Sequence, residues 1–384
     1  MIGLCICYYN NNYGSMLQAY ATTQELERRG LSYEIIAYKK EINFSYLIQN
    51  IGRLFNKYWL QEKSLVLQKK ISQKKYPAYD MNTQIRDKKF YEFRHKYFDG
   101  NVRVCKGYNE LKSIADTYDI VIVGSDQMWS PSGLATNFYN LMFVPDNTRK
   151  VSYASSFGVE KIPTSQKKRT AVFLKRIEYL SVREKSAVKI IAELTNRNAE
   201  LVVDPTMLLS RKEWESFSAK DRVVDEPYIF SYFLGSNSEH REKTVALSKI
   251  KKLKIVTLRH LDEYVASDEQ FGDIPLYDIG PKEFLNLIKN AEYICTDSFH
   301  GTVFSILFQK QFLTFFRYNA NASISKNSRI TSLLSSLGLT HRSYNNANSI
   351  VQQIDDEIDY GKVEANLSRM VKKSKLFLDE ALRL

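Results

Sequence analysis

The chain has 384 residues, a net charge of +12 and an ordinary globular composition, with 44% hydrophobic and 26% charged residues. At roughly 100–200 residues per domain, this length predicts two domains with a cleft between them. The composition argues against large-scale disorder, and no basic leader or apolar run of about 18 residues suggests a signal peptide or membrane span. The four cysteines match no disulfide framework or zinc site, so we expect a soluble protein of the cytoplasm.

The first 40 residues alternate between strand and helix patterns. Residues 2–8 predict a short apolar strand, Ser15 is a candidate cap for a helix over 16–29, and residues 33–38 predict a second strand. This alternation is typical of an α/β fold with a parallel sheet.

A basic segment follows, and residues 45–115 read as helices with basic faces, inserted into the first domain. Between Arg53 and Arg103 lie nine lysines and four arginines against five acidic residues. A solvated helical face is the interpretation we favour, because charge runs usually lie at the surface. The alternative is contact with an anionic partner, either phospholipid or the diphosphate of a lipid-linked substrate. Nucleic acid is not favoured, since no recognition motif accompanies the charge.

The strand pattern returns at residues 120–123, and polar residues follow each predicted strand up to residue 206. In open α/β sheets, ligands bind beyond the carboxyl ends of the strands. The polar stretch at 210–226 predicts a linker. We expect a first domain over 1–215, a second over 226–350, and a final helix within 361–384 that packs back on the first domain. The remaining predicted elements are strands at 151–158, 179–184, 201–209, 228–235, 254–259, 293–297 and 311–316, and helices at 238–250, 281–291 and from Thr302.

The stretch TDSFHGTVFS, residues 296–305, places His300 between a predicted strand and a predicted helix. The free N–H groups and the dipole of a helix N-terminus favour an anion there. A bound phosphate would help to keep the imidazole protonated, as a general acid requires. A packed or capping histidine is the equally weighted alternative.

Asp126 and Arg183 also follow predicted strands. In GSDQMW, Asp126 is either a general base or hydroxyl-binding group, or a residue that stabilises a turn. Arg183 in SVREK needs a partner beside an apolar strand, and Glu184 or an anionic ligand would serve. Asp204 is a candidate structural partner of Arg183 across neighbouring strands.

Weaker signals are the amide-rich loop from Asn10 to Tyr13, suited to sugar hydroxyls or phosphate, and Arg329 at a further predicted helix start. The sequence contains no GxGxxG motif, no P-loop, no nucleophile elbow and no metal-ligand cluster.

Seven segments in order resemble the polysaccharide pyruvyl transferase family. They are YNNNYGSMLQAYA, VIVGSDQMWSP, YASSFG, SVREKSA, VVDPTMLL, GPKEFLNLIKNAEYICTDSFHGTVFSILFQKQF and NSRITSLLSSLGL. The resemblance implies two Rossmann-like domains of the glycosyltransferase-B type that face a cleft. It also implies transfer of the pyruvyl group of phosphoenolpyruvate onto two hydroxyls of one sugar, which gives a cyclic ketal and phosphate. That scheme needs no metal and no cofactor beyond the donor substrate.

The resemblance assigns roles to the residues above. His300 would protonate the methylene of phosphoenolpyruvate, Arg183 would bind its phosphate or carboxylate, and Asp126 would take the proton of the incoming hydroxyl. Several family members read Arg-Leu-His-Gly where this chain reads Ser-Phe-His-Gly, so the arginine is missing at Ser298. Arg317, Arg329, or Ser298 with backbone N–H groups would replace it. The full expected substrate-binding set is Asn10, Asn12, Tyr13, Gly124, Ser125, Gln127, Ser298, Phe299, Gly301, Arg317 and Arg329.

The acceptor implied by this resemblance is a lipid-linked glycan, such as one on undecaprenyl diphosphate, in capsular or exopolysaccharide biosynthesis. The basic segment at 53–103 would then contact the inner face of the membrane peripherally. One alternative is a glycosyltransferase of the same fold that uses a sugar nucleotide, because a fold does not determine the chemistry. Another is a non-catalytic glycan-binding relative.

Overall fold

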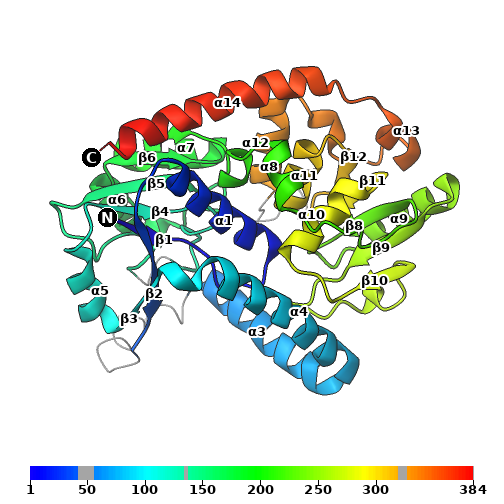
Figure 1. Cartoon of the computed structure of the whole chain (residues 1–384), viewed down its shortest axis with the longest axis horizontal. Helices are drawn as coiled ribbons and strands as arrows, with labels where there is room; N and C mark the ends of the chain where they lie inside the picture. The colour runs from blue at the N-terminus through cyan, green and yellow to red at the C-terminus, as the bar shows by residue number, and fades with distance from the viewer. Residues whose placement is uncertain (42–55, 134–136, 319–326, 384) are drawn as a thin grey trace.

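Two open parallel sheets form the framework of the protein (Figure 1). The computed structural model describes residues 1–41, 56–133, 137–318 and 327–383. All strand pairings within the two sheets are parallel. The α/β class predicted from the alternating pattern is therefore confirmed.

The first sheet has seven strands in the order β3-β2-β1-β4-β5-β6-β7. The strand order reverses between β1 and β4, which makes this position the switch point where a doubly wound sheet binds ligands. Its strands are β1 (Ile2–Cys5), β2 (Tyr33–Lys39), β3 (Val102–Lys106), β4 (Ile120–Val123), β5 (Arg149–Ser155), β6 (Tyr179–Val182) and β7 (Glu200–Leu201).

The second sheet repeats this arrangement with five strands in the order β10-β9-β8-β11-β12. Its switch point lies between β8 and β11. The strands are β8 (Tyr228–Tyr232), β9 (Lys254–Leu258), β10 (Ile274–Leu276), β11 (Tyr293–Thr296) and β12 (Gln311–Thr314).

Helices connect the strands and cover the sheets (Figure 1). Those joined to the first sheet are α1 (Tyr13–Arg28), α5 (Gly107–Ala115), α6 (Thr164–Arg176) and α7 (Lys185–Thr195). Those of the second half are α8 (Arg211–Phe217), α9 (Ser238–Lys251), α10 (Pro281–Asn290), α11 (Phe299–Leu307), α12 (Ser328–Leu337) and α13 (Ile350–Asp355).

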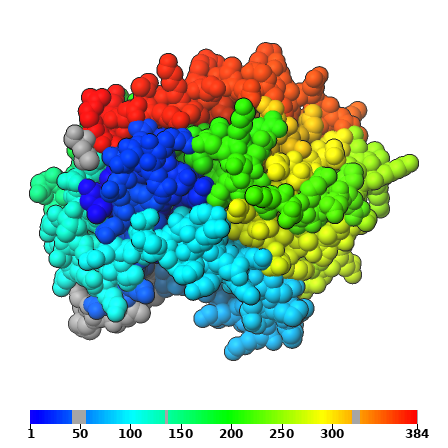
Figure 2. Space-filling view, in the orientation of Figure 1, coloured from blue at the N-terminus to red at the C-terminus, as the bar shows by residue number. Residues whose placement is uncertain are grey.

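The basic segment differs from its prediction. Helices α3 (Lys57–Lys75) and α4 (Pro77–Tyr97) form a hairpin that projects from the body (Figures 1 and 2). The predicted insertion over 45–115 is too long, because β3 at Val102–Lys106 is the edge strand of the first sheet and α5 packs beside it. Three of its five side chains are exposed and only Cys105 is buried, as fits a strand at the edge of the sheet. The part from 42 to 55, which includes Arg53, lies outside the described residues.

Four predicted segments also differ in the structure. Helix α1 begins at Tyr13 with Asn12 as its cap, where Ser15 was expected. Helix α11 begins at Phe299, three residues before Thr302, because Ser298 caps it. The apolar run over 201–209 forms only the two-residue strand β7 and a short 3₁₀ turn at Pro205–Met207, since proline cannot donate a ladder hydrogen bond. The expected linker at 210–226 contains α8, which starts with a capping box at Ser210.

The long helix α14 (Tyr360–Ala381) runs from the second half of the molecule across to the first (Figure 1). Its Ser374 hydroxyl accepts a hydrogen bond from the backbone N–H of Val203, and Phe377 packs against Tyr153. One apolar core spans both sheets, and within it the Tyr13 ring stacks on Phe284 of α10 at 4.7 Å. The two halves are thus packed together around a common interior. No described helix is long and apolar enough to span a membrane.

Candidate active site

The two switch points meet at the start of α1 and the start of α11. The loop after β4 brings Asp126 to this point, and β6 ends just before Arg183. Helix α11 brings His300 from the second sheet. The convergence follows from topology, because the carboxyl ends of parallel strands lie at one edge of each sheet. The sequence-based grouping of these three residues therefore corresponds to one place in the molecule.

His300 lies in the first turn of α11 and is 6% exposed. Its Nε2 has no hydrogen-bond partner and lies 3.7 Å from Oδ2 of Asp204, which is too long for a hydrogen bond. The other edge of the ring faces α1, where a Cβ atom added at Gly14 would lie 1.9 Å from His300 Nδ1. Gly14 is therefore the residue that lets the ring approach α1, and Nε2 remains available for a ligand.

Arg183 is the centre of a buried ion-pair cluster. Its Nη1 donates to Asp204 Oδ2 at 2.5 Å, and its Nη2 donates to Asp126 Oδ1 at 3.1 Å. The hydroxyl of Ser125 also donates to Asp204 at 2.9 Å. Burial lowers the pKa of Arg183, but the charges of the carboxylates raise it above its ordinary value. The guanidinium is therefore held in one position. Its predicted partner Asp204 is confirmed, whereas Glu184 accepts instead from the backbone of Phe157.

Asp126 has a backbone φ of 78°, a left-handed conformation that is uncommon for a residue with a side chain. Its carbonyl accepts hydrogen bonds from two backbone N–H groups, and its Oδ2 accepts from the Ser15 hydroxyl at 2.8 Å. Burial raises the pKa of Asp126, but the charges of Arg183, His300 and Arg329 outweigh burial and lower the pKa to about 2. The carboxylate therefore stays ionised and is a weak base when no ligand is bound.

Asp204 lies beneath the cluster with its carboxylate fully buried. Its Oδ1 accepts two hydrogen bonds from Thr206, one from the backbone and one from the hydroxyl. Burial raises the pKa of Asp204, yet the nearby His300, Arg183 and Thr206 lower it far more. Asp204 thus compensates the positive charge of Arg183 inside the cluster.

Arg329 differs from Arg183 because it has no counter-ion. It is 8% exposed, and within the described residues no hydrogen bond or ion pair engages its guanidinium. Both guanidinium groups lie over the Phe299 ring, with their carbon atoms 4.7 Å from the ring centroid for Arg183 and 5.5 Å for Arg329. Burial and the charge of Arg183 lower the pKa of Arg329 to about 10. A buried cation without a partner is costly unless an anion binds beside it.

Three further predicted residues lie around the helix start. The hydroxyl of Ser298 caps α11 by accepting from the Gly301 N–H at 3.2 Å, and its own hydrogen remains free to donate. A Cβ added at Gly301 would lie 2.5 Å from Thr296 Oγ1, so glycine allows the helix to sit close to its strand. Arg317 pairs with Asp297 at 3.5 Å and contacts its carbonyl, which leaves Arg317 less available than Arg329.

The structure does not bring every predicted residue to this cluster. The Tyr13 hydroxyl donates to the Ile279 carbonyl and its ring is buried between the two halves, so the structure gives Tyr13 a packing role. Asn12 is occupied as the cap of α1, Gln127 lies against Gly158, and Gly124 leaves room for Ile6. Asn10 accepts a backbone hydrogen bond in the turn before α1.

Two residues at the cluster were absent from the predicted set, namely Gly14 and Ser15. Ser15 was assigned only as a cap, and no sequence signal distinguishes a capping serine from one that donates to a carboxylate across the site. Gly14 was inconspicuous because its importance depends on the distance to a residue 286 positions away. Within the described residues, no group of three His, Cys, Asp or Glu side chains could hold a metal ion.

Together, the fold and the cluster define a two-domain Rossmann-like protein of the glycosyltransferase-B type with a buried cluster of charged residues where its two halves meet. The family model for polysaccharide pyruvyl transferase matches residues 12–319. The chain therefore belongs to the polysaccharide pyruvyl transferase family, as its sequence segments predicted.

Solved structures with the same architecture share little sequence with the chain. A protein from Listeria monocytogenes described as a UDP-N-acetylglucosamine 2-epimerase aligns with a TM-score of 0.51 and 10% identity, over 97% of this chain and 90% of the other. A UDP-GlcNAc 2-epimerase from Neisseria meningitidis bound to UDP-GlcNAc aligns with a TM-score of 0.48 and 10% identity, over 100% of this chain and 99% of the other. MurG from Acinetobacter baumannii aligns with a TM-score of 0.45 and 7% identity, over 100% of this chain and 99% of the other. No curated protein matches the sequence. At these identities the likeness concerns the fold alone.

Proposed function

We propose that the protein transfers the pyruvyl group of phosphoenolpyruvate onto two hydroxyls of one sugar in a glycan acceptor. The observation that carries this proposal is that two groups whose charges both act on Asp126, the guanidinium of Arg329 and the imidazole of His300, have buried nitrogen atoms without a hydrogen-bond partner among the described residues. Phosphoenolpyruvate brings a phosphate and a carboxylate, and its reaction needs a proton at the methylene carbon. The cluster offers a cation without a counter-ion and an imidazole nitrogen without a partner at the same place.

The reaction balances with these groups. His300 donates a proton to the methylene carbon, which becomes a methyl group and makes the neighbouring carbon electrophilic. The first sugar hydroxyl adds to that carbon, phosphate leaves, and the second hydroxyl closes the ketal. Of the two protons that the hydroxyls release, one reprotonates the imidazole and the other departs with the phosphate. With its pKa lowered to about 2, Asp126 serves best as a hydrogen-bond acceptor that orients the hydroxyl and stabilises the imidazolium.

Arg329 supplies the charge that the absent arginine at Ser298 would have provided. It stacks on the same Phe299 ring as Arg183, so both guanidinium groups border one volume. Arg183 is already neutralised by two carboxylates. An incoming phosphate or carboxylate would therefore interact most strongly with Arg329, with the Ser298 hydroxyl as a second donor.

The direct test is incubation of the protein with phosphoenolpyruvate and a panel of lipid-linked glycans. We expect phosphate release only with the right glycan, together with the mass of one added pyruvyl ketal. His300→Gln should lower turnover by about 10²–10⁴, the range for loss of a general acid. Turnover at the wild-type level in that variant would remove His300 from the mechanism. Stabilisation by a sugar nucleotide with no response to phosphoenolpyruvate would favour a glycosyltransferase instead.

The projecting hairpin supports a lipid-linked acceptor at a membrane surface. None of the residues of α3 is buried, and Leu60, Leu67 and Ile71 are 47%, 59% and 55% exposed. Their spacing of seven and four residues places them on one helical face. Lys69 and Gln73, which contact Asp262 and α4, mark a different face. Lysines 57, 63, 70, 74 and 75 lie along the same helix. An aliphatic stripe with flanking lysines suits an anionic lipid surface.

Vesicle sedimentation tests this contact. We expect the protein to bind vesicles containing phosphatidylglycerol and not neutral phosphatidylcholine vesicles. The triple variant Leu60→Ser, Leu67→Ser and Ile71→Ser should bind at least about tenfold more weakly, since burying even part of three aliphatic side chains exceeds 1.4 kcal/mol. The matched control replaces three exposed aliphatic residues elsewhere, Val172, Ile250 and Leu376, by serine. Equal binding by both triple variants would exclude the hairpin as the membrane contact.

A further inference from the structure

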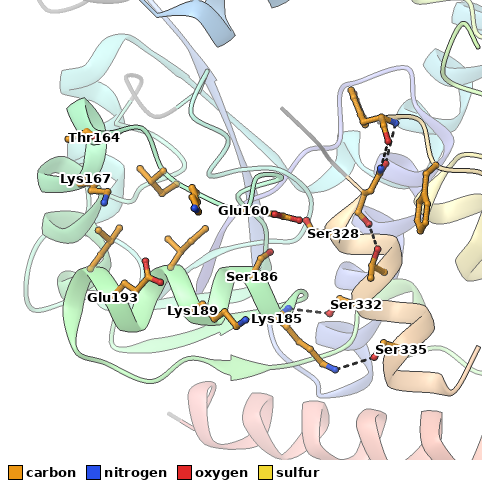
Figure 3. A pocket seen from close by; sticks show the side chains of 18 residues that line it. Glu160, Thr164, Lys167, Lys185, Ser186, Lys189, Glu193, Ser328, Ser332 and Ser335 are labelled. Atoms are coloured by element: carbon orange, nitrogen blue, oxygen red, sulfur yellow. Dashed lines mark hydrogen bonds between the residues drawn. The ribbon is translucent and has the colours of Figure 1, made fainter. Parts of the chain in front are cut away.

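A second site lies beside the cluster, in a cavity of about 1030 Å³ between the two halves of the molecule (Figure 3). Helices α6 and α7 and the segment at 160–162 line one side, and α12 with Phe316 and Tyr318 lines the other. The cavity adjoins the cluster, because Lys185 follows Arg183 by two residues and Ser328 precedes Arg329. Its volume is at the upper end of the range for sites of small organic ligands, and it is far larger than phosphoenolpyruvate requires.

The cavity is lined by four lysines and two glutamates. The glutamates are Glu160 and Glu193, and the lysines are Lys161, Lys167, Lys185 and Lys189. Lys185 Nζ lies 3.5 Å from the Ser335 hydroxyl. Within the described residues, the other three lysines have no hydrogen bond or ion pair. The lining therefore carries excess positive charge that the protein leaves unneutralised, as expected where an anion binds.

Two helix starts also converge on the cavity. Helix α7 begins at Lys185 and α12 begins at Ser328, and neither has a side-chain cap. The start of α7 is joined to the second turn of α12 across the domain boundary, since the Lys185 N–H donates to the Ser332 hydroxyl at 3.2 Å. The hydroxyls of Ser186 and Ser328 are buried without a partner. Uncapped N–H groups and unpartnered hydroxyls next to lysines can bind the oxygen atoms of a phosphate.

Along α12 the cavity presents a row of hydroxyls from Ser328, Ser332 and Ser335 (Figure 3), and Thr331 also lines it. These positions recur every three or four residues, which places them on one face of the helix. A hydroxyl-lined face beside an anion-binding corner suits a ligand with sugar hydroxyls and a phosphate. Such a ligand would extend from the sugar that reacts at His300.

We propose that this cavity binds the acceptor through a diphosphate, with Lys185 and Lys189 on the diphosphate and the hydroxyl row of α12 on the attached sugar. The assignment of the ligand as the acceptor rests on the proposed function. The diphosphate recognition itself depends only on the lining. Two classes of compound contain a sugar attached to a diphosphate, namely polyprenyl-diphosphate sugars and nucleoside-diphosphate sugars.

Isothermal titration of the full chain in the absence of phosphoenolpyruvate tests the proposal. Inorganic diphosphate should bind, and Lys185→Gln with Lys189→Gln should weaken binding at least about tenfold, as expected for losing charge-assisted contacts. The control Lys249→Gln removes an exposed lysine from α9 and should leave binding unchanged. In the Arg329→Met background, where the cation of the cluster is gone, the double lysine substitution should weaken binding by the same factor, because Arg329 does not line the cavity.

The opposite pattern, with binding lost in Arg329→Met and kept in the double lysine variant, would place the diphosphate in the cluster and overturn the proposal. No binding to the wild-type chain would overturn it as well. Tighter binding of farnesyl diphosphate than of uridine diphosphate identifies a lipid source, and the reverse order identifies a nucleotide source. Failure of phosphoenolpyruvate to react with any acceptor would refute the pyruvyl transfer while leaving these binding results intact.

Discussion

Replacement of Arg329 by methionine should make the fold more stable and the donor site weaker. Methionine has a similar length and no charge, so the substitution removes the unpaired guanidinium without leaving a large cavity. The pKa of Arg329 falls from 12.5 to about 10. At 1.36 kcal/mol per unit this corresponds to about 3 kcal/mol against the charged form in the folded protein. We therefore expect a stabilisation of about 1–3 kcal/mol, as seen when buried charges are replaced by apolar residues.

The assay is thermal unfolding with and without phosphoenolpyruvate and phosphate. At about 2–4 °C per kcal/mol for domains of this size, Arg329→Met should melt several degrees higher than wild type. Ligand at about 100 times its Kd should stabilise the wild-type protein by about 2.7 kcal/mol. The variant should lose most of that response, because the cation that attracts the ligand is gone.

Arg342 provides the matched control. It is also a buried arginine without a carboxylate partner, but backbone carbonyls accept all of its hydrogen bonds, those of Phe312, Gln353, Ile354 and Asp356. Arg342→Met should lower stability by more than about 3 kcal/mol, since it leaves several buried carbonyls unsatisfied. If Arg329→Met destabilised the protein as much as Arg342→Met, or kept the full response to phosphoenolpyruvate, the assignment of Arg329 as an anion-binding residue would be refuted.

Three other perturbations test the rest of the cluster. Gly14→Ala should displace the buried His300 ring, lower turnover by about 10²-fold and cost about 1–3 kcal/mol of stability through overpacking, whereas Gly100→Ala, which has no neighbour within 4 Å of the new methyl group, should behave as wild type. Asp204→Asn should destabilise the protein by about 3–5 kcal/mol in denaturant titrations, because the guanidinium that it neutralises remains buried; a change below about 1 kcal/mol would contradict this. The pKa of Asp126 is lower in the folded state, at about 2, than in the unfolded state, at about 4. The ionised carboxylate therefore stabilises the folded state above about pH 4, and this stabilisation is lost as the pH falls toward about 2. Melting temperatures should therefore fall across this window, and less steeply in Asp126→Asn; parallel profiles would refute this linkage.

The fold was largely predictable because parallel sheets have a strong local pattern. Short apolar runs followed by Gly, Ser or Asp turns predicted the bounds of β4 and β11 to within one residue. They also predicted the polar residues that follow each of these strands. The pattern failed where tertiary packing decides the conformation. The run LVVDPTMLL has the apolar character of a strand, but Asp204 turns into the cluster and Pro205 ends the ladder. Strand β10 has three partly exposed residues at a sheet edge, one of them a proline, too few for a periodic pattern.

The structure brings together the three predicted residues Asp126, Arg183 and His300, but the sequence did not indicate Gly14, Ser15 or the electrostatics of the cluster. Asp126, Arg183 and His300 were identified because each follows the carboxyl end of a predicted strand. In a parallel sheet the topology alone brings such positions together. Which arginine is neutralised depends on distances that only the fold defines. Arg183 forms ion pairs with two carboxylates, whereas Arg329, identified from sequence only as a residue at a helix start, forms none within the described residues.

This difference between the two arginines explains how the cluster can keep its geometry and still bind an anion. A cation whose charge is already compensated by Asp126 and Asp204 gains less from binding an anion, but it keeps its position between turnovers. A cation without a counter-ion gains more energy from binding an anion, yet it destabilises the folded protein while the site is empty. By stacking both guanidinium groups on Phe299, the protein supports the unpaired Arg329 with a ring held in place by the paired Arg183. The cationic role of the arginine missing at Ser298 can thus be taken over by a residue from a different helix, because a phosphate requires a nearby cation and not a particular origin in the chain.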